Sequence, residues 1–270
     1  MRNIRKLGIV FSSSAAVLLI TVTIGFLACR TNSSKMPANQ ESRAESRDKQ
    51  KSDPKDQLYL KSLLNIKTIP PPDKLRRTTI LNTLADKFKY QCYLEIGLGR
   101  KENNYDWVEC RAKTSVDPNP LLKAAFPMTS DQYFALHHDF MDLIFVDGLH
   151  HADQVERDIA NSLNVLKRNG TIVVHDCNPT TEEMQIVPGQ SQQAWTGDVW
   201  KAWVKLRATR ADLTMAVVNV DNGCGIIRRG GQETIAMPEQ LTYPLFEINR
   251  AKWLNLISIE EFLRDLRRYR

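Results

Sequence analysis

Residues 141–178 read MDLIFVDGLHHADQVERDIANSLNVLKRNGTIVVHDCN, and this order of residue types predicts a strand, a helix and a second strand. Two short apolar runs, MDLIFV and TIVV, each stop at acidic or imidazole side chains, which is typical of buried strands that end at a polar edge. Between them, apolar residues recur at helical spacing, and Gly170 is the expected C-terminal stop of that helix. The stretch therefore predicts a parallel β-α-β unit.

The flanking sequence extends this alternation. Apolar runs predict further strands at 92–97, 111–120, 213–220 and 223–229. Helical periodicity predicts helices at 58–90, 197–210 and 259–270. The turn residues Asp221 and Asn222 make the last two strands a closing antiparallel pair. The expected fold is α/β, with a doubly wound, mostly parallel sheet and an antiparallel edge strand.

Composition and charge limit the class of protein. The 270 residues are 42% apolar and 25% charged, which excludes a wholly disordered, collagen-like or disulfide-dense chain. The net charge of +6 lies in residues 1–55, which hold ten basic and four acidic side chains, and residues 56–270 carry no net charge. Because a nucleic-acid-binding domain needs basic residues on its folded part, we expect no nucleic-acid partner.

The N-terminal residues read as a membrane anchor. Residues 7–29 contain no charged side chain, and a membrane-spanning helix needs about 20 apolar residues. A cleaved signal peptide would be shorter and would carry a clean small-residue cleavage site. A lipoprotein would place its lipidated residue at Cys29, but the motif before it is irregular. We therefore predict a single-pass anchor over residues 1–29, and basic residues on both sides of it leave its orientation open.

Residues 30–56 contain no aromatic or β-branched apolar residue, which predicts a disordered linker. The rest of the chain, 57–270, is expected to form one domain with its core at about 90–230. The five cysteines have neither paired nor zinc-like spacing, which indicates free thiols.

Polar residues follow each of the predicted parallel strands. They are Glu95, Gly97 and Gly99 at the first strand, Asp117 at the second, Asp147 and His150 at the third, and His175 and Asp176 at the fourth. The carboxyl ends of parallel strands meet at one edge of the sheet, where open α/β sheets bind their ligands. The sequence therefore predicts one binding site at that edge.

The glycines at 97 and 99 let backbone amides approach a ligand closely. Asp117 follows Gly97 by 20 residues, which is the spacing at which a carboxylate binds ribose hydroxyls. A nicotinamide-dinucleotide fingerprint would need a third glycine, which is missing here. The glycine pair alone is also typical of a tight strand–helix turn.

Taken together, the segments YLEIGLGR, SVDPNP, MTSDQYF, DLIFVDGLHHADQVERDIANSLNVLKRNGTIVVHDCNPTTEEMQ and GDVWKAWVKLRATR resemble class I S-adenosylmethionine-dependent methyltransferases. More narrowly, they are similar to the group related to macrocin-type O-methyltransferases and cephalosporin-hydroxylase-like proteins. The resemblance covers about residues 90–230. It implies a Rossmann-like methyltransferase sheet, S-adenosylmethionine as cofactor and a small-molecule acceptor such as a sugar hydroxyl.

The resemblance also implies which residues bind the cofactor. They are Glu95, Gly97 and Gly99 for the methionine portion, Asp117 for the ribose, Ser130 and Asp131 on the adenine side, and also Asp147 and Gly148. Asp147 and His150 match the D-G-x-H block that faces the transferred methyl group. One position departs from the family pattern. Members commonly have glycine six residues after the motif glutamate, and this chain has Lys101, which would narrow the pocket or point to solvent.

The candidate catalytic residues are Asp147, His150 and His175. Imidazole titrates near neutrality, so His150, close to Asp147, is our candidate base for the acceptor proton. The alternative is that His150 caps the helix that starts near Ala152. His175 is either a second base or a buried residue at the end of its strand.

A metal ion is a further hypothesis. Asp147 and Asp176 would end adjacent strands about 4.8 Å apart, so both carboxylates could reach one Mg²⁺, and in metal-dependent relatives the position of Asp176 helps to bind it. The alternative is that Asp147 accepts backbone hydrogen bonds and Asp176 caps a turn. The tryptophans at 195, 200 and 203 would either line an acceptor pocket or, as is usual at helical spacing, form core.

Three functions follow from this interpretation. The first is a methyltransferase with a small-molecule partner, tethered to the membrane by its N-terminal helix; the supply of S-adenosylmethionine favours the cytosolic side. The second is a catalytically inactive, membrane-tethered binding module of the same fold, which Lys101 favours. The third is an NAD(P)-dependent oxidoreductase, which the missing third glycine disfavours.

Overall fold

The computed structural model describes residues 76–189 and 195–268. The predicted anchor (1–29), the predicted linker (30–56) and the first part of the helix expected at 58–90 lie outside these residues. Within the two described ranges, no helix has the length and apolar character that crossing a membrane requires.

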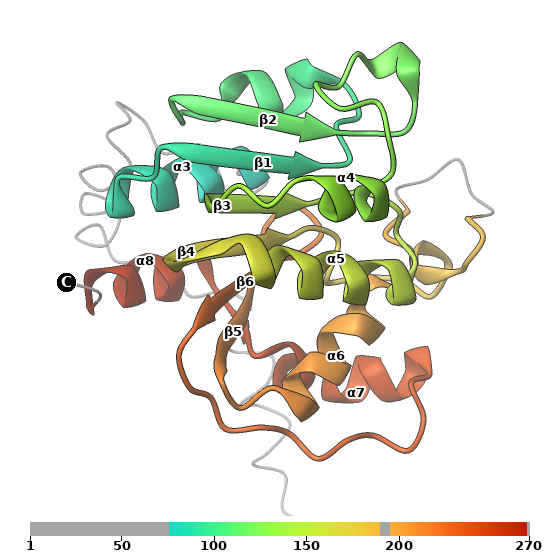
Figure 1. The fold of residues 1–270 in the computed structure, drawn as a ribbon. Coiled ribbons are helices and arrows are strands. Elements are labelled where there is room, and N and C mark those ends of the chain that lie inside the picture. Colours follow the sequence, from blue (N-terminus) through green and yellow to red (C-terminus); the bar gives the residue numbers. More distant parts are fainter. Residues whose placement is uncertain (1–75, 190–194, 269–270) are drawn as a thin grey trace, which may run out of the picture. The chain divides into compact units, whose positions relative to one another are not determined.

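Seven strands form one sheet in the order β2-β1-β3-β4-β6-β5-β7 (Figure 1). The strands are β1 Cys92–Ile96, β2 Ala112–Val116, β3 Met141–Val146, β4 Leu166–Val174, β5 Leu213–Val218, β6 Cys224–Arg229 and β7 Leu256–Ile257. The first four are parallel to one another, which confirms the predicted β-α-β units.

The antiparallel strand lies inside the sheet, which corrects the expectation of an antiparallel edge. β6 pairs antiparallel with both β4 and β5, and β7 pairs parallel with the outer side of β5. The short turn after β5 makes β6 its direct neighbour, and β6 fills the space next to β4. The edges are therefore β2 and the two-residue strand β7, which is too short for a sequence pattern to reveal.

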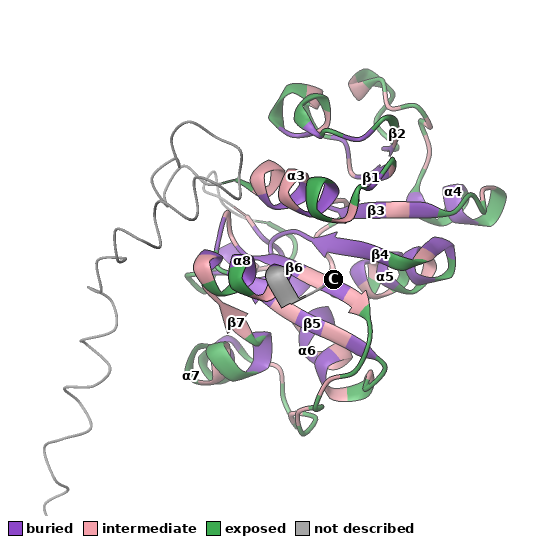
Figure 2. Ribbon diagram, turned by 90° about the vertical axis from the view of Figure 1, so that its left-hand side faces the viewer, coloured by how far each residue is buried: buried purple, intermediate pink, exposed green. Residues whose placement is uncertain are grey.

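Helices cover both faces of the sheet. The helices are α3 Arg77–Phe88, α4 Ser130–Leu136, α5 Ala152–Val165, α6 Val199–Thr209, α7 Tyr243–Leu254 and α8 Ile259–Arg268, with 3-10 turns η2 Lys101–Asn103, η3 Tyr105–Trp107, η4 Pro120–Leu122 and η5 Glu183–Gln185. α3 and α8 pack on one face, whereas α4, α5, α6 and α7 pack on the other. Figure 2 shows α3 and α8 on the opposite side of the sheet from α4 and α5.

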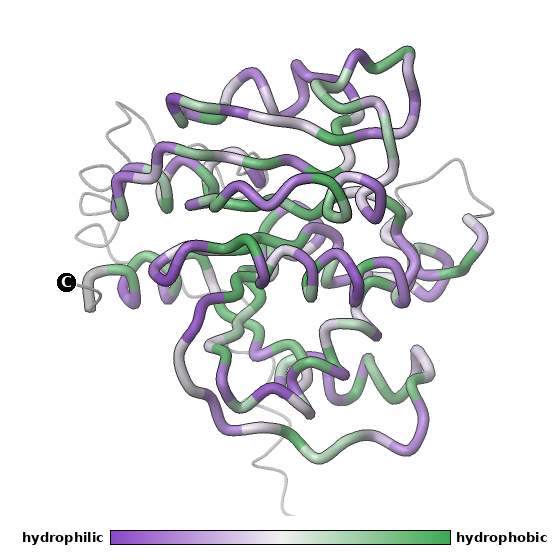
Figure 3. The backbone as a smooth tube through the Cα atoms, viewed as in Figure 1, coloured by the Kyte–Doolittle hydropathy of each residue, from purple (hydrophilic) through white to green (hydrophobic). Residues whose placement is uncertain are grey.

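The two faces have separate apolar cores that share the strands. In β3, Ile144 and Val146 pack under α5, and Leu143 and Phe145 pack under α3. Because side chains alternate along a strand, a strand that is covered on both faces is apolar at every position. Figure 3 shows this hydrophobic character along the central strands. Each fully buried side chain of this size contributes about 1.5–3 kcal/mol.

The helix after β3 is shorter than the sequence predicted. α5 ends at Val165 and β4 begins at Leu166, so the expected helix stop at Gly170 is wrong. Gly170 lies inside β4, where a Cβ atom would come within 2.7 Å of the Leu166 side chain and 2.8 Å of the Asp142 carbonyl oxygen. The glycine is therefore needed for the close approach of β4 to β3.

Two helices were not predicted. α4 is short, and α7 has no clear amphipathic pattern. In α7, Phe246 packs on Trp200 with ring centroids 4.5 Å apart. Trp200 and Trp203 are fully buried, which confirms that they belong to the core rather than to an acceptor pocket.

The chain order changes direction at β1, because β2 lies on one side of it and β3 on the other. The carboxyl ends of β1, β2, β3 and β4 therefore face the same edge, as does the turn between β5 and β6. We call this edge the carboxyl rim. It is the position at which open α/β sheets bind ligands.

Candidate active site

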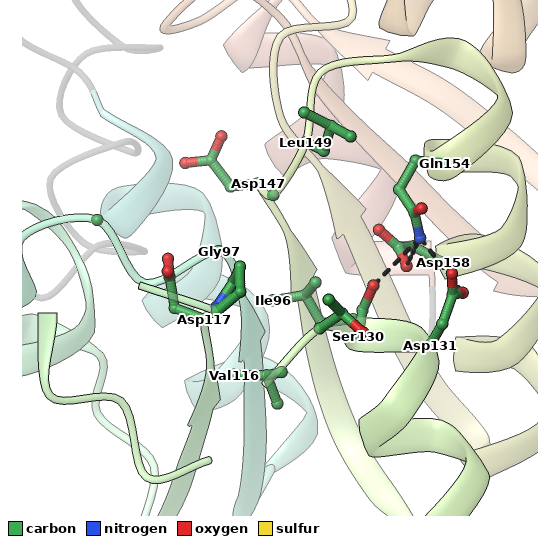
Figure 4. A pocket seen from close by; sticks show the side chains of 14 residues that line it. Ile96, Gly97, Val116, Asp117, Ser130, Asp131, Asp147, Leu149, Gln154 and Asp158 are labelled. Carbon is green, nitrogen blue, oxygen red and sulfur yellow. Dashed lines mark hydrogen bonds between the residues drawn. The ribbon is translucent and has the colours of Figure 1, made fainter. Parts of the chain in front are cut away.

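A cavity of about 500 Å³ lies at the carboxyl rim, between the ends of β1, β2 and β3 and the helices α4 and α5 (Figure 4). Its volume is typical of a small-molecule site. Seven predicted cofactor-binding residues line it: Gly97, Gly99, Asp117, Ser130, Asp131, Asp147 and Gly148. The structure therefore brings these seven residues together around one cavity.

The two glycines form the floor of the cavity at the end of β1. Gly97 has a φ of +84°, and a Cβ atom there would lie 2.1 Å from the carbonyl oxygen of Asp147. Gly99 has a φ of +52°, but a Cβ atom there would meet nothing within 4 Å. Gly97 is therefore required by the contact between the ends of β1 and β3, whereas Gly99 is favoured by its backbone conformation alone.

Asp117 stands at the end of β2 beside this loop. Its Oδ2 accepts a hydrogen bond from the backbone N–H of Leu98 at 3.0 Å, and its Oδ1 accepts one from Asn119 at 2.8 Å. These bonds fix the carboxylate at the cavity wall and tie it to the glycine loop.

The opposite wall comes from α4 and α5. Gln154 of α5 donates to Ser130 Oγ at 3.2 Å and to Asp158 Oδ1 at 3.0 Å (Figure 4). Burial raises the pKa of Asp158. Gln154 and Asp158 were not among the predicted site residues. They lie four positions apart, on the same face of the predicted helix, and this spacing could have identified them.

Glu95 does not line the cavity. Its carboxylate is buried below the loop, where it accepts hydrogen bonds from the Tyr93 hydroxyl and from Asn104 Nδ2 at 3.0 Å. Thr78 of α3 in turn donates to Asn104 at 2.8 Å. The geometry therefore places Glu95 as a support beneath the loop, and its predicted contact with the cofactor stays a prediction.

The predicted catalytic residues converge next to the cavity. Asp147 Oδ1 lies 3.2 Å from His175 Nδ1 and 3.3 Å from His150 Nε2. Asp176 also contacts both imidazoles, 3.3 Å from His150 and 3.1 Å from His175. We call these four residues the acid–imidazole cluster.

Two further residues contact this cluster, and the sequence analysis did not predict them. Arg77, the first residue of α3, places Nη1 2.6 Å from Asp147 Oδ2. Asp221, in the turn between β5 and β6, accepts hydrogen bonds from the backbone N–H and the Nε of Arg77, both at 3.0 Å. Arg77 begins a helix, and Asp221 follows a strand that the sequence analysis assigned to an antiparallel pair, so the rule that located the other site residues was not applied to them.

The charges of the cluster are mutually dependent. Burial by itself would raise the pKa of Asp147, but His175, His150 and Arg77 outweigh it and hold that pKa well below its ordinary value. Burial lowers the pKa of His175, but Asp147 and Asp176 more than reverse this and raise it well above its ordinary value. The pKa of His150 is also raised, because its hydrogen bond to Asp147 and the charge of Asp176 outweigh burial. The cluster therefore favours an ionised Asp147 and protonated imidazoles.

The same side chains fit a divalent cation. Asp147, His175 and Asp176 each offer one ligand atom, and these atoms lie within 4.8 Å of one another. Asp176 Oδ1 is buried, and its one contact among the described residues is with His175 Nδ1 at 3.1 Å. Carboxylate oxygens and imidazole nitrogens are ligands for divalent cations. The structure adds His175 to the two ligands that the sequence indicated.

A family model described as a methyltransferase domain matches residues 101–177, which include most of the cavity-lining residues and all four residues of the cluster. This part of the chain is similar to a methyltransferase domain. This confirms the resemblance to class I S-adenosylmethionine-dependent methyltransferases, whereas the narrower likeness to macrocin-type enzymes stays a prediction.

Solved structures similar to this chain include an SAH-bound methyltransferase from Podospora anserina, PaMTH1, with 18% identity and a TM-score of 0.43 over 74% of this chain and 100% of that one. A putative caffeoyl-CoA O-methyltransferase from Staphylococcus aureus has 13% identity and a TM-score of 0.43 over 71% and 99%. The O-methyltransferase TomG from Streptomyces achromogenes, in complex with SAM, has 14% identity and a TM-score of 0.41 over 72% and 97%. None of the curated proteins matches the sequence.

The remaining predictions concern residues around the site. Lys101 does not line the cavity; its ammonium group lies 5.9 Å from the centre of the Tyr105 ring. The N-terminus of α5 is capped by Asp198, whose Oδ1 accepts from Ala152 N–H at 2.8 Å, so the alternative in which His150 caps this helix is not observed. Trp195 stacks on His150 with ring centroids 5.2 Å apart and is the one of the three tryptophans next to the cluster.

Proposed function

We propose that this methyltransferase transfers the methyl group of S-adenosylmethionine to the hydroxyl oxygen of a small molecule, such as a sugar. The observation that carries the proposal is the position of Asp147, which lines the cavity and also contacts both histidines of the cluster. A methyl donor in the cavity and an acceptor at the cluster would therefore meet at this residue.

The cavity supplies the groups that the donor needs. Asp117, fixed by two backbone hydrogen bonds, can accept hydrogen bonds from ribose hydroxyls. The backbone at Gly97 and Gly99 is open to the methionine portion, and Ser130 and Asp131 line the wall assigned to the adenine.

The cluster supplies the groups that the acceptor needs. Methyl transfer requires the acceptor oxygen to lie in line with the sulfonium methyl group and to lose its proton. His150 suits the role of base better than His175, because 18% of its side chain is exposed against 3%. It can take the acceptor proton only in its neutral form, which its raised pKa makes available at higher pH. His175 instead holds Asp147 in place. Bound by Asp147, His175 and Asp176, a divalent cation would supply Lewis acidity that lowers the pKa of the acceptor hydroxyl.

Cofactor binding separates this proposal from its alternatives. We expect isothermal titration calorimetry of the full chain to show binding of S-adenosylmethionine and none of NAD. Replacing Asp117 by alanine should weaken S-adenosylmethionine binding at least tenfold, since hydrogen bonds to a charged group contribute about 1.5–3 kcal/mol. The exposed variant Asp139→Ala is the control and should bind as wild type does. If neither ligand binds, the result would support an inactive module. If NAD alone binds, the result would support an oxidoreductase.

Turnover tests the cluster. Incubation with methyl-labelled S-adenosylmethionine and a panel of sugars and other hydroxyl compounds should yield a labelled product, and Asp147→Ala should abolish it. Retained activity in that variant would contradict the catalytic assignment. The metal is tested separately by EDTA, because full activity after exhaustive chelation would exclude it from the reaction.

The proposal includes attachment to the membrane through residues 1–29, supported by their uncharged length in the sequence. We expect the full chain to remain in the membrane fraction after an alkaline carbonate wash. Recovery in the supernatant would contradict the anchor without affecting the assignment of the active site.

A further inference from the structure

Arg77 contacts the acid–imidazole cluster from the start of α3. Its Nη1 lies 2.6 Å from Asp147 Oδ2 and 3.3 Å from His175 Nδ1, so one guanidinium contacts two of the three candidate metal ligands. The Arg77 side chain is 24% exposed and that of Asp147 is 16% exposed, so this contact is largely shielded from water.

Arg77 is held in this position by Asp221. One carboxylate oxygen, Oδ2 of Asp221, accepts both the backbone N–H and the Nε of Arg77 at 3.0 Å. Asp221 itself is 6% exposed and stands in the left-handed turn between β5 and β6, with a φ of +50°. The N-terminus of α3 and its first side chain are thus fixed together by one acid from a distant hairpin.

A divalent cation at the cluster would use the same Asp147 carboxylate and the same His175 imidazole. An ion bound by Asp147 and His175 would lie close to the guanidinium, and like charges at such short range repel strongly where water is excluded. Asp147 Oδ2, already bonded to Arg77, could join a metal only if the guanidinium withdrew. The arginine and the metal are therefore alternative cations for one carboxylate.

We propose that Arg77 competes with a divalent cation for Asp147, so that docking of α3 on Asp221 lowers the metal affinity of the cluster. Without metal, Arg77 is the positioning residue that orients Asp147. With metal bound, the contact between the start of α3 and the rim is weakened to the same extent, because coupling between two binding events is reciprocal. This inference rests on the metal assigned under the proposed function, but not on methyl transfer.

Binding of Mn²⁺ to the full chain, measured by electron paramagnetic resonance in the absence of S-adenosylmethionine, tests the competition. We expect Arg77→Gln to bind Mn²⁺ at least tenfold more tightly than wild type, a difference of about 1.4 kcal/mol. Arg77→Lys, which restores the charge, should return the affinity toward wild type. The matched control is Arg76→Gln. Arg76 carries the same charge, but its side chain is 68% exposed and its contact with Asp221 is longer, at 3.6 Å. Equal affinities of wild type and Arg77→Gln, or no Mn²⁺ binding to either, would overturn the proposal.

A second measurement uses wild type alone, and it tests the competition between Arg77 and the cation even if Arg77→Gln does not fold. Hydrogen exchange of wild type should become faster at the first amides of α3 when Mn²⁺ is saturating, while the exchange of α5 amides stays unchanged. Unaltered exchange at α3 under saturating Mn²⁺ would contradict the competition. If competition is observed but no acceptor is ever methylated, the proposed function fails and this inference stands.

Discussion

Glu95 shows how a single buried acid makes stability depend on pH. Burial raises its pKa to about 8, because the desolvation of the charge outweighs the hydrogen bonds from Tyr93 and Asn104. The folded state therefore holds a proton that the unfolded chain releases near pH 4.5. Stability from this group is complete below that pH and is lost as the pH rises toward 8.

We expect Glu95→Gln to remove this dependence, because the amide keeps a polar group of the same shape without a charge. Between pH 5 and 8, wild type should lose up to about 1.4 kcal/mol per pH unit relative to the variant. Urea unfolding at several pH values measures the difference. Parallel curves for the two proteins would contradict the raised pKa of Glu95.

At the scale of residues, the sequence predicted what lies at strand ends and little else. Asp117, Asp147 and His175 could be placed because a parallel strand delivers whatever follows it to the rim. Arg77 and Asp221 could not be placed, since one begins a helix and the other sits in a hairpin turn, and their pairing spans 144 positions. Only the packing of α3 against the rim brings these two together.

The glycine loop is the element on which the cavity depends. We expect Gly97→Ala to destabilise the fold and to abolish S-adenosylmethionine binding, because its Cβ would lie 2.1 Å from a carbonyl oxygen in the end of β3. Gly99→Ala is the matched comparison, since it shares the left-handed backbone but has open space around it. That variant should lose about 1–2 kcal/mol.

Thermal unfolding and calorimetric titration of both variants distinguish backbone conformation from steric contact. Equal losses in Gly97→Ala and Gly99→Ala would show that the contact between the ends of β1 and β3 is not what requires glycine. A larger loss at Gly97 supports the close approach.

Elements with a strong pattern were predicted well, and weak patterns were not. β1, β2, β3 and α6 have continuous or periodic apolar residues, and each was located from the sequence. The boundary between α5 and β4 was wrong because Lys167, Arg168 and Asn169 look like a helix end, although they belong to β4 and lie in the irregular part between its pairs with β3 at Leu166 and Thr171. The boundary depends on which strand pairs with β4, and the local sequence does not give that pairing.

In the molecule as a whole, the two apolar cores are joined by the strands that pass between them. Phe262 of α8 is buried in one core, whereas Trp200, Trp203 and Trp253 belong to the other. If the strands couple both cores, Phe262→Ala should cost about 3–5 kcal/mol and should shift the tryptophan-fluorescence transition on the far face by the same amount as the circular-dichroism transition.

Urea unfolding followed by both signals tests this coupling. The control Leu245→Ala, at a side chain of α7 that is 40% exposed, should change stability by less than about 0.5 kcal/mol. A fluorescence midpoint that stays in place while the circular-dichroism midpoint falls would show two independently unfolding halves.

The direction of β6 has a consequence for how such a protein can diversify. Because this strand runs against its neighbours, the hairpin before it turns at the carboxyl rim and places Asp221 there, on the side away from Asp117 and the glycine loop. Under the proposed function, the hairpin therefore stands beside the acceptor but outside the donor cavity. Altering the length or residues of this hairpin would then change which molecules are accepted while the nucleoside-binding half keeps its shape, so new substrates could be acquired without losing the shared methyl donor.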